Sequence, residues 1–333
     1  MKKVLINITI GFIISLGFLL LTNCKKTENP IKYSKGTFPD TVVNLSGINS
    51  AYDDYNSALL QLTGNIPLVF SSNRGSSGGQ FDLVQGTLSF IFDQTNGAFG
   101  LADEISNNQF ITKLITKVNT PGNDFGPYRL YSSYDGYEYL ILSSVNGSGN
   151  LDFQFTKNRP LFGTVIPEVD GPFPAKLLNT NADEAYICFD TNQDTAYFTS
   201  NAEGNFDIYI HKRPPTSTIE TWLNQNYESS VKVDSLNSSS DDRCPLVYKK
   251  IMVFTSNRPG GMGGYDLYYS VFRKGKWSSP VNMGPRINTA SDEFRPIIGG
   301  YEDFTNLFMI FSSNKPGGEG GFDLYFTGIN FPE

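Results

Sequence analysis

Histidine is almost absent from this chain, which has one histidine, His211, and three cysteines in 333 residues. A lone histidine supports no Ser–His–Asp triad without partners, and no His or Cys cluster has metal-ligand spacing. Charged residues are also scarce, at 18%, and the net charge of −7 argues against a nucleic-acid partner, whose phosphates require a basic face. Aromatic residues are plentiful, at 14%, alongside 32 Gly and 18 Pro. This profile is typical of short strands and tight turns.

The N-terminal segment 1–23 resembles a bacterial lipoprotein signal peptide. Two lysines precede an almost wholly apolar run over 4–21, and Cys24 follows at once. The resemblance implies cleavage before Cys24 and attachment of lipid to its thiol, which would anchor the exported protein to a membrane. Lys25 follows the cysteine, so we expect an outer-membrane destination, on either its periplasmic or its surface face. The alternative is an uncleaved anchor helix, because the run is almost long enough to span a bilayer. The polar residues 24–34 are predicted to be a flexible tether.

If Cys24 carries lipid, Cys188 and Cys244 remain. Export would permit a disulfide between them. The two lie at non-equivalent positions of different repeats, so we expect two buried free thiols.

One hairpin pattern occurs five times, and it predicts the architecture. Its clearest copy is 310–326, which reads IFSSNKPGGEGGFDLYF: a strand, a glycine-rich turn and a second strand. A close copy is 253–268, and shorter or more divergent copies lie at 69–83, 141–153 and 197–209. A second pattern, Asn-Thr/Ser followed by an acidic pair, precedes each hairpin. The two patterns recur every 55 to 59 residues in the later units, and the first unit carries an insertion within 86–108.

Each unit is predicted to hold four strands. The second strands, such as 307–311, are apolar on both faces and must be covered on both, which stacked sheets in a ring achieve. The last unit lacks a fourth strand, and 35–46 matches the fourth-strand segment that begins at Lys274. We therefore predict an all-β fold. It is a five-bladed β-propeller of four-stranded antiparallel blades over 35–333, closed by the N-terminal strand joining the last blade. The predicted blades are about 48–117, 118–177, 178–235, 236–286, and 287–333 together with 35–46.

The paired patterns look like the WD40-like (PD40) β-propeller repeat. That repeat is found in TolB-type proteins and in propellers joined to OmpA-type domains. The likeness covers nearly all of the chain after 34 and is strongest in the last two units. It implies a cell-envelope interaction module, while the OmpA-type domain itself is absent.

The aspartate of each Phe-Asp or equivalent pair could suggest catalysis, but it recurs in every unit, whereas a catalytic group is normally needed once. We interpret these residues as structural turn aspartates that accept backbone N–H bonds. They are Asp82, Asp152, Asp207, Asp266 and Asp323.

The second acid of each acidic pair precedes the innermost strand, so five-fold repetition would place these acids around one mouth of the channel. Such a ring could hold a hard cation such as Ca²⁺. The alternative is turn capping by short acidic side chains. The ring consists of Asp54, Asp124, Glu184, Asp242 and Glu293.

The leading functional hypothesis is a lipid-anchored, monomeric, non-catalytic scaffold that binds another envelope or surface protein. One alternative is a lectin-like propeller that binds glycan. Another is a glycoside hydrolase-like five-bladed propeller, which would need an acid and a nucleophile or base at a defined separation in a central pocket. The carboxylates repeat equivalently and nothing marks a unique pair, so we expect no enzymatic activity and no cofactor other than calcium.

Overall fold

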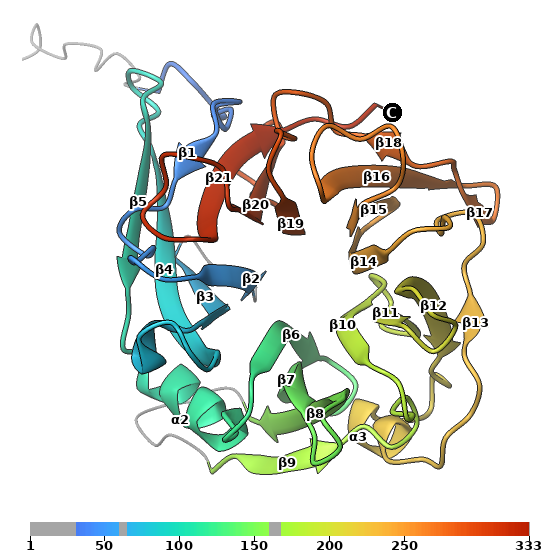
Figure 1. Ribbon diagram of the computed structural model, residues 1–333. Helices are drawn as coiled ribbons and strands as arrows, with labels where there is room; N and C mark the ends of the chain where they lie inside the picture. Colours follow the sequence, from blue (N-terminus) through green and yellow to red (C-terminus); the bar gives the residue numbers. More distant parts are fainter. Residues whose placement is uncertain (1–30, 60–64, 160–167, 333) are drawn as a thin grey trace, which may run out of the picture.

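The computed structural model describes residues 31–59, 65–159 and 168–332. These residues form five antiparallel sheets arranged as blades around a central axis (Figure 1). The predicted all-β, five-bladed propeller is confirmed. The lipoprotein signal and Cys24 lie outside the described residues.

Within each blade the chain runs from an innermost strand to the rim. Blade 1 is β2 (Asp54–Leu59), β3 (Asn65–Ser72), β4 (Asp82–Phe92) and β5 (Phe99–Ile105). Blade 2 is β6 (Asp124–Ser132), β7 (Tyr137–Val145), β8 (Leu151–Asn158) and β9 (Asp170–Pro174). Blade 3 is β10 (Glu184–Phe189), β11 (Thr195–Ser200), β12 (Asp207–Lys212) and β13 (Val231–Lys232).

Blade 4 is β14 (Asp242–Tyr248), β15 (Ile251–Ser256) and β16 (Asp266–Arg273), whose outer edge pairs with both β17 (Lys276–Trp277) and β18 (Val281–Asn282). Blade 5 is β19 (Glu293–Gly300), β20 (Leu307–Ser313) and β21 (Asp323–Ile329). Its fourth strand is β1 (Val43–Asn44), which comes from the other end of the chain.

The N-terminal segment closes the ring, as the sequence predicts. Val43 pairs with Phe326 and Asn44 with Tyr325, so β1 covers the outer edge of β21 (Figure 1). Phe38 lies just before β1 and is 1% exposed. It stacks on Phe304 with ring centroids 3.8 Å apart. Segments from near the start and the end of the described residues are therefore held in one blade.

The second strand of a blade contributes side chains to two different cores. Phe308 and Ile310 pack at the seam between blades 5 and 1, while Met309 and Phe311 pack toward blade 4. All four are fully buried. This alternation explains why the strand is apolar on both faces.

Blade 1 accounts for the extra length noted in the sequence. Its β4 and β5 form a long hairpin, and helix α2 (Gln109–Val118) follows. The Asn108 side chain caps α2 by accepting bonds from the N–H groups of Phe110 and Ile111. The apolar face of the helix packs against Val69, Leu83, Leu140 and Leu142. A second, shorter helix, α3 (Ile219–Leu223), lies beside blade 3.

Cys188 and Cys244 are free and buried, as expected. Burial raises the pKa of each thiol to about 12, so both are protonated and unreactive at neutral pH. Within the described part of the chain, no helix is long and apolar enough to cross a membrane.

Candidate functional site

An asparagine before each blade joins that blade to the preceding one. Asn288 accepts a hydrogen bond from the N–H of Leu267 at 2.8 Å and donates one to the carbonyl oxygen of the same residue at 3.0 Å. The amide thus pairs with the backbone as an edge strand would. The same two bonds join Asn49 to Leu324, Asn119 to Leu83, Asn179 to Phe153 and Asn237 to Ile208. These asparagines are clamps between blades.

The first residue of each acidic pair crosses the same seam. Asp292 accepts a bond from the N–H of Tyr265 at 2.8 Å and one from the amide of Asn314 at 3.0 Å. The equivalent bonds to N–H groups are Asp53 with Phe322, Asn123 with Phe81, Asp183 with Leu151, and Asp241 with Phe206. Because the Asp53 bond joins blade 5 to blade 1, this set of contacts forms a closed circle.

The five residues of the predicted acidic ring are buried, and each is the first residue of an innermost strand. Glu293 is 0% exposed and accepts bonds from the N–H and hydroxyl of Thr289 and from the hydroxyl of Ser313. Asp54, Asp124, Glu184 and Asp242 are bonded in the same way to the Ser or Thr four residues earlier. These contacts match the turn-capping alternative. No group of three or more His, Cys, Asp or Glu among the described residues could hold a metal, and calcium binding stays a sequence prediction.

Asp124 gives this ring a measurable pH dependence. Burial raises the pKa of its carboxyl group to about 6, and the bonds from Ser144 and Thr120 offset only part of that effect. Its pKa in the unfolded chain is about 3.9, so the folded state binds the proton more tightly. We expect the contribution of Asp124 to stability to be greatest below pH 4 and to fall by about 2–3 kcal/mol as the pH rises to 7.

This prediction is tested by urea unfolding between pH 4 and 7 in the native protein and in Asp124→Asn. The amide cannot ionise, so the variant should lose about 2–3 kcal/mol less than the native protein over that range. Equal pH dependence in the two proteins would contradict the prediction.

The predicted turn aspartates have different environments in different blades. Asp266 accepts bonds from the N–H groups of Met262 and Gly263, and Asp323 from those of Glu319 and Gly320. In both turns a side chain on the second glycine would collide with the carboxylate; a Cβ at Gly261 would lie 2.5 Å from the Asp266 Oδ2.

Among the described residues, the aspartates of the other three blades lack these backbone bonds; the turns of blades 2 and 3 are shorter, while that of blade 1 has the same length but a different sequence. Asp82 accepts from Gln80, Asp207 pairs with Lys232, and Asp152 has a buried oxygen without a partner among the described residues. The expected bonding to turn N–H groups therefore holds in blades 4 and 5, where the full Gly-Gly-x-Gly-Gly turn wraps the carboxylate.

The centre of the ring is closed by side chains. Each innermost strand has a bulge in which one residue adopts a left-handed φ between 48° and 60°. These residues are Asn56, Gly126, Tyr186, Cys244 and Arg295. Arg295, from blade 5, donates to the Pro127 carbonyl of blade 2 at 3.0 Å and lies 5.5 Å from the Tyr186 ring of blade 3. None of these five residues is a carboxylate, so the bulges supply no central acid pair.

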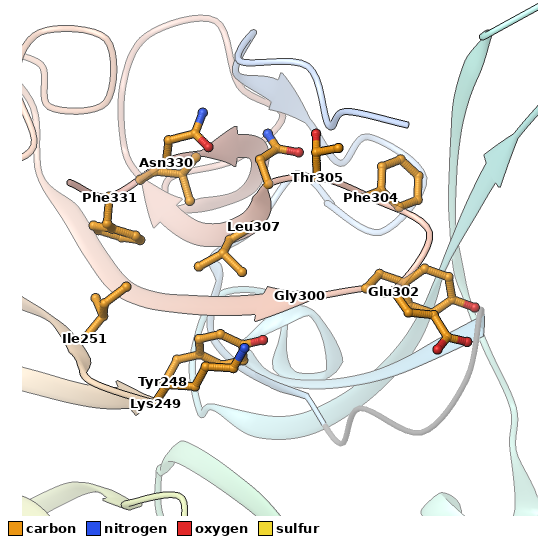
Figure 2. Close-up of a pocket in the computed structure, with 13 residues that line it drawn as sticks. Tyr248, Lys249, Ile251, Gly300, Glu302, Phe304, Thr305, Leu307, Asn330 and Phe331 are labelled. Atoms are coloured by element: carbon orange, nitrogen blue, oxygen red, sulfur yellow. The ribbon is translucent and has the colours of Figure 1, made fainter. Parts of the chain in front are cut away.

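A cavity of about 490 Å³ lies between blades 4 and 5, on the face opposite the glycine-rich turns. It is bounded by the β14–β15 hairpin, the β19–β20 hairpin and the chain after β21. Figure 2 shows Tyr248 and Lys249 on one side, with Leu307 and Phe331 across from them and Glu302 at one end. The lining residues are Tyr248, Lys249, Ile251, Gly300, Tyr301, Glu302, Phe304, Thr305, Asn306, Leu307, Ile329, Asn330 and Phe331.

Residues outside the pocket pack against its lining and hold it in place. Phe331 packs edge-on against Tyr269 at 5.1 Å, and Phe304 is fixed by its stack on Phe38. Gly300 lets the Tyr248 side chain lie close to β19, because a Cβ there would be 2.5 Å from the tyrosine hydroxyl. Lys249 and Glu302 are exposed, so the rim carries one charge of each sign. No residue of this pocket was predicted from the sequence as a site.

No protein-family model matches the chain, and no curated protein matches it. Solved structures do share its architecture. An endo-arabinase from Bacteroides thetaiotaomicron is 13% identical with a TM-score of 0.52, over 87% of this chain and 98% of that one. The catalytic domain of an α-L-arabinofuranosidase from Coprinopsis cinerea is 12% identical with a TM-score of 0.54, over 90% of this chain and 98% of that domain. An exo-β-1,3-galactanase from Clostridium thermocellum is 13% identical with a TM-score of 0.56, over 88% of this chain and 63% of the galactanase chain.

These comparisons correct several expectations. The PD40 and TolB-type resemblance is wrong, since no family model matches and the similar structures are five-bladed glycoside hydrolases. The expectations of a non-catalytic scaffold, of no enzymatic activity and of a protein partner are corrected by the same comparison, since the solved structures that share this fold include an endo-arabinase and an exo-β-1,3-galactanase. A membrane anchor through Cys24 gains no support from them. At 12–13% identity the likeness shows the fold alone.

Proposed function

We propose that the protein acts on glycans as a glycoside hydrolase-like propeller, and that the pocket between blades 4 and 5 receives the sugar. The observation that carries the proposal is the lining of this pocket. The rings of Tyr248, Tyr301 and Phe331 lie beside the charged rim residues Lys249 and Glu302. The similar structures supply the second support, because glycoside hydrolases use this architecture.

The pocket has the chemistry that sugars require. Its volume of about 490 Å³ falls within the range of roughly 300–1,000 Å³ that is usual for ligand sites. Tyrosine and phenylalanine rings offer flat apolar faces to the C–H face of a sugar, and the tyrosine hydroxyls can bond to its hydroxyls. Lys249 and Asn330 add polar groups at the rim, and the exposed Glu302 is a carboxylate that can transfer a proton to or from a sugar oxygen.

One observation favours a second candidate, sugar binding without cleavage. Glycoside hydrolysis commonly uses two carboxylates that flank the scissile bond. Among the described residues that line the pocket, Glu302 is the one carboxylate. A lectin-like role would need the aromatic faces and the polar rim but no second acid.

The two candidates are separated by measuring release of reducing ends and binding on arabinan, arabinoxylan and β-1,3-galactan. We expect binding to at least one of them and cleavage of the bound glycan. Glu302→Gln should retain binding and lower cleavage by about 100-fold or more, as expected for loss of an acid–base group. Tyr248→Ala should weaken binding by about tenfold through loss of the aromatic face.

Glu319→Gln is the matched control, since Glu319 is an exposed glutamate in the glycine-rich turn on the opposite face. Thermal melts should show that all three variants fold. Binding without cleavage would assign the lectin-like role. Failure to bind any of the glycans, or equal loss in Glu319→Gln and Glu302→Gln, would contradict the proposed site.

A further inference from the structure

Blade 4 encloses an arginine side chain in a socket at the seam with blade 3. Arg258 follows the Ser-Asn of the glycine-rich hairpin, and its guanidinium bonds to the buried Asp242 and, at 2.7 Å, to the carbonyl oxygen of Leu236. Its Nε donates to the Ser256 hydroxyl at 2.9 Å. The same guanidinium lies 5.2 Å from the Phe254 ring and 4.9 Å from the Tyr268 ring. A carboxylate, a hydroxyl, a carbonyl and two aromatic rings thus surround one cation.

Blades 1 and 5 also carry a cation at this position, with fewer of these contacts. Arg74 bonds to Asp54 at 2.5 Å and to the Ile48 carbonyl oxygen at 2.6 Å, and it lies over a phenylalanine ring. In blade 5 the ammonium group of Lys315 lies 3.8 Å from the centre of the Tyr325 ring.

Blade 2 has neither the cation nor either ring, and Leu142 takes the place of Phe254. Asn146 takes the place of the arginine, and Gln154 takes the place of the tyrosine. The Gln154 amide instead donates to Ser144 at the bottom of the site. The cation and its aromatic partners are therefore lost together in that blade.

Blade 3 keeps the socket and lacks the cation. Thr-Ser-Asn-Ala at 199–202 stands where blade 4 has Thr-Ser-Asn-Arg at 255–258, so Ala202 takes the place of Arg258. A cavity of about 210 Å³ lies there. Its lining includes the counterparts of all five groups that hold Arg258, namely Leu178, Glu184, Phe198, Ser200 and Tyr209.

Two polar groups of this cavity, the Glu184 carboxylate and the Tyr209 hydroxyl, lack the cationic partner that Arg258 provides in blade 4. Glu184 is 0% exposed and accepts bonds from Thr180 and Ser200, neither of which carries charge. Tyr209 is 8% exposed, and its hydroxyl has no hydrogen-bond partner within the described residues. Lys232 is held by Asp207 at 2.6 Å and by Glu203 at 3.2 Å, and is not part of the lining.

The mouth of the cavity adds further contacts. Tyr227, Ser229, Ser230 and Glu203 form it, and Tyr227 is 55% exposed. We propose that the blade 3 cavity binds a guanidinium or primary ammonium group of an external ligand, in the place where blade 4 holds its own Arg258. Glu184 supplies the negative charge, the Phe198 and Tyr209 rings supply cation–π contacts, and Tyr227 covers the bound group. The site is separate from the proposed sugar pocket and does not depend on it.

The test is calorimetric titration of the full chain at constant ionic strength with methylguanidinium and with glucosamine. Methylurea and N-acetylglucosamine are the neutral counterparts. We expect millimolar binding of at least one cation and at least tenfold weaker binding of its neutral counterpart. The stronger cation distinguishes a guanidinium ligand, as on an arginine side chain, from an amino sugar.

Ala202→Arg is the decisive variant, because it places in blade 3 the side chain that blade 4 already carries. It should abolish cation binding and raise the melting temperature by about 2–4 °C. Tyr209→Phe should weaken cation binding several-fold while the protein stays folded, and Ala182→Arg, in the preceding turn outside the cavity lining, is the control for added charge. Binding of neither cation by the native protein, or undiminished binding by Ala202→Arg, would overturn the proposal.

Discussion

Replacing Phe38 with alanine is expected to lower the free energy of unfolding by about 3–5 kcal/mol, the usual cost of truncating a buried phenylalanine. Phe38 is 1% exposed, and its ring stacks on Phe304. It also meets the edges or faces of Phe90, Phe99, Phe308 and Phe326 at 5.0–5.9 Å.

The backbone of Phe38 makes the effect larger than packing alone suggests. Its N–H donates to the Asn306 side chain at 2.8 Å, and its carbonyl oxygen accepts from the same side chain at 3.0 Å. If the ring is lost and the segment shifts, these buried bonds weaken together with the pairing of β1 to β21. Blade 5 would then expose the edge of β21.

Equilibrium unfolding in urea measures the change. Val43→Ala is the matched control, since Val43 lies on β1 in the same segment and is 37% exposed. That variant should lose less than about 1 kcal/mol. If Phe38→Ala were no less stable than Val43→Ala, the closing segment would contribute little to the fold.

Most of the fold was predictable because the sequence repeats. Each unit has two landmark patterns, and each pattern recurs about every 57 residues in the later units, which predicted the number of blades. The match between 35–46 and the segment that begins at Lys274 predicted the closing strand. Pairing of Val43 with Phe326 confirms that prediction. The roles of individual motif residues were harder to predict. Asp292 and Asn288 bond to the backbone of the preceding blade, and a repeated sequence pattern does not show whether a side chain contacts its own blade or an adjacent one.

The sugar pocket could not be predicted from the repeats. Tyr248 and Glu302 lie on two hairpins that are more than 50 residues apart, and only the packing of blade 4 against blade 5 brings them to one cavity. The hairpin residues also differ between blades, so no periodic signal marks them. The blade 3 cavity was different in this respect: the sequence shows Ala202 at a position that is held by Arg74, Arg258 and Lys315 in blades 1, 4 and 5 and by Asn146 in blade 2. What the sequence could not show was that the rest of the socket is kept.

Replacing Asn288 with alanine is expected to cost about 3–5 kcal/mol. The side chain is 1% exposed, and it serves both the N–H and the carbonyl oxygen of Leu267, which is itself fully buried. Alanine leaves both backbone groups without partners at the seam between blades, and each unsatisfied buried group costs about 1–3 kcal/mol. Water could reach them only if the seam opened, so the loss should appear in the unfolding free energy of the whole propeller.

The comparison that tests this reasoning is Asn96→Ala, because Asn96 is an exposed asparagine whose side chain accepts one bond from the N–H of Ala98 within a turn. It should cost less than about 1 kcal/mol, since water can replace that bond. A clamp variant at Asn237, which holds Ile208 by the same two bonds, should match Asn288→Ala. If Asn288→Ala and Asn96→Ala were equally stable in urea, the asparagine pattern would not be what joins the blades. The bonds of Asp292 and its equivalents, together with apolar contacts across the seams, would then have to carry that role.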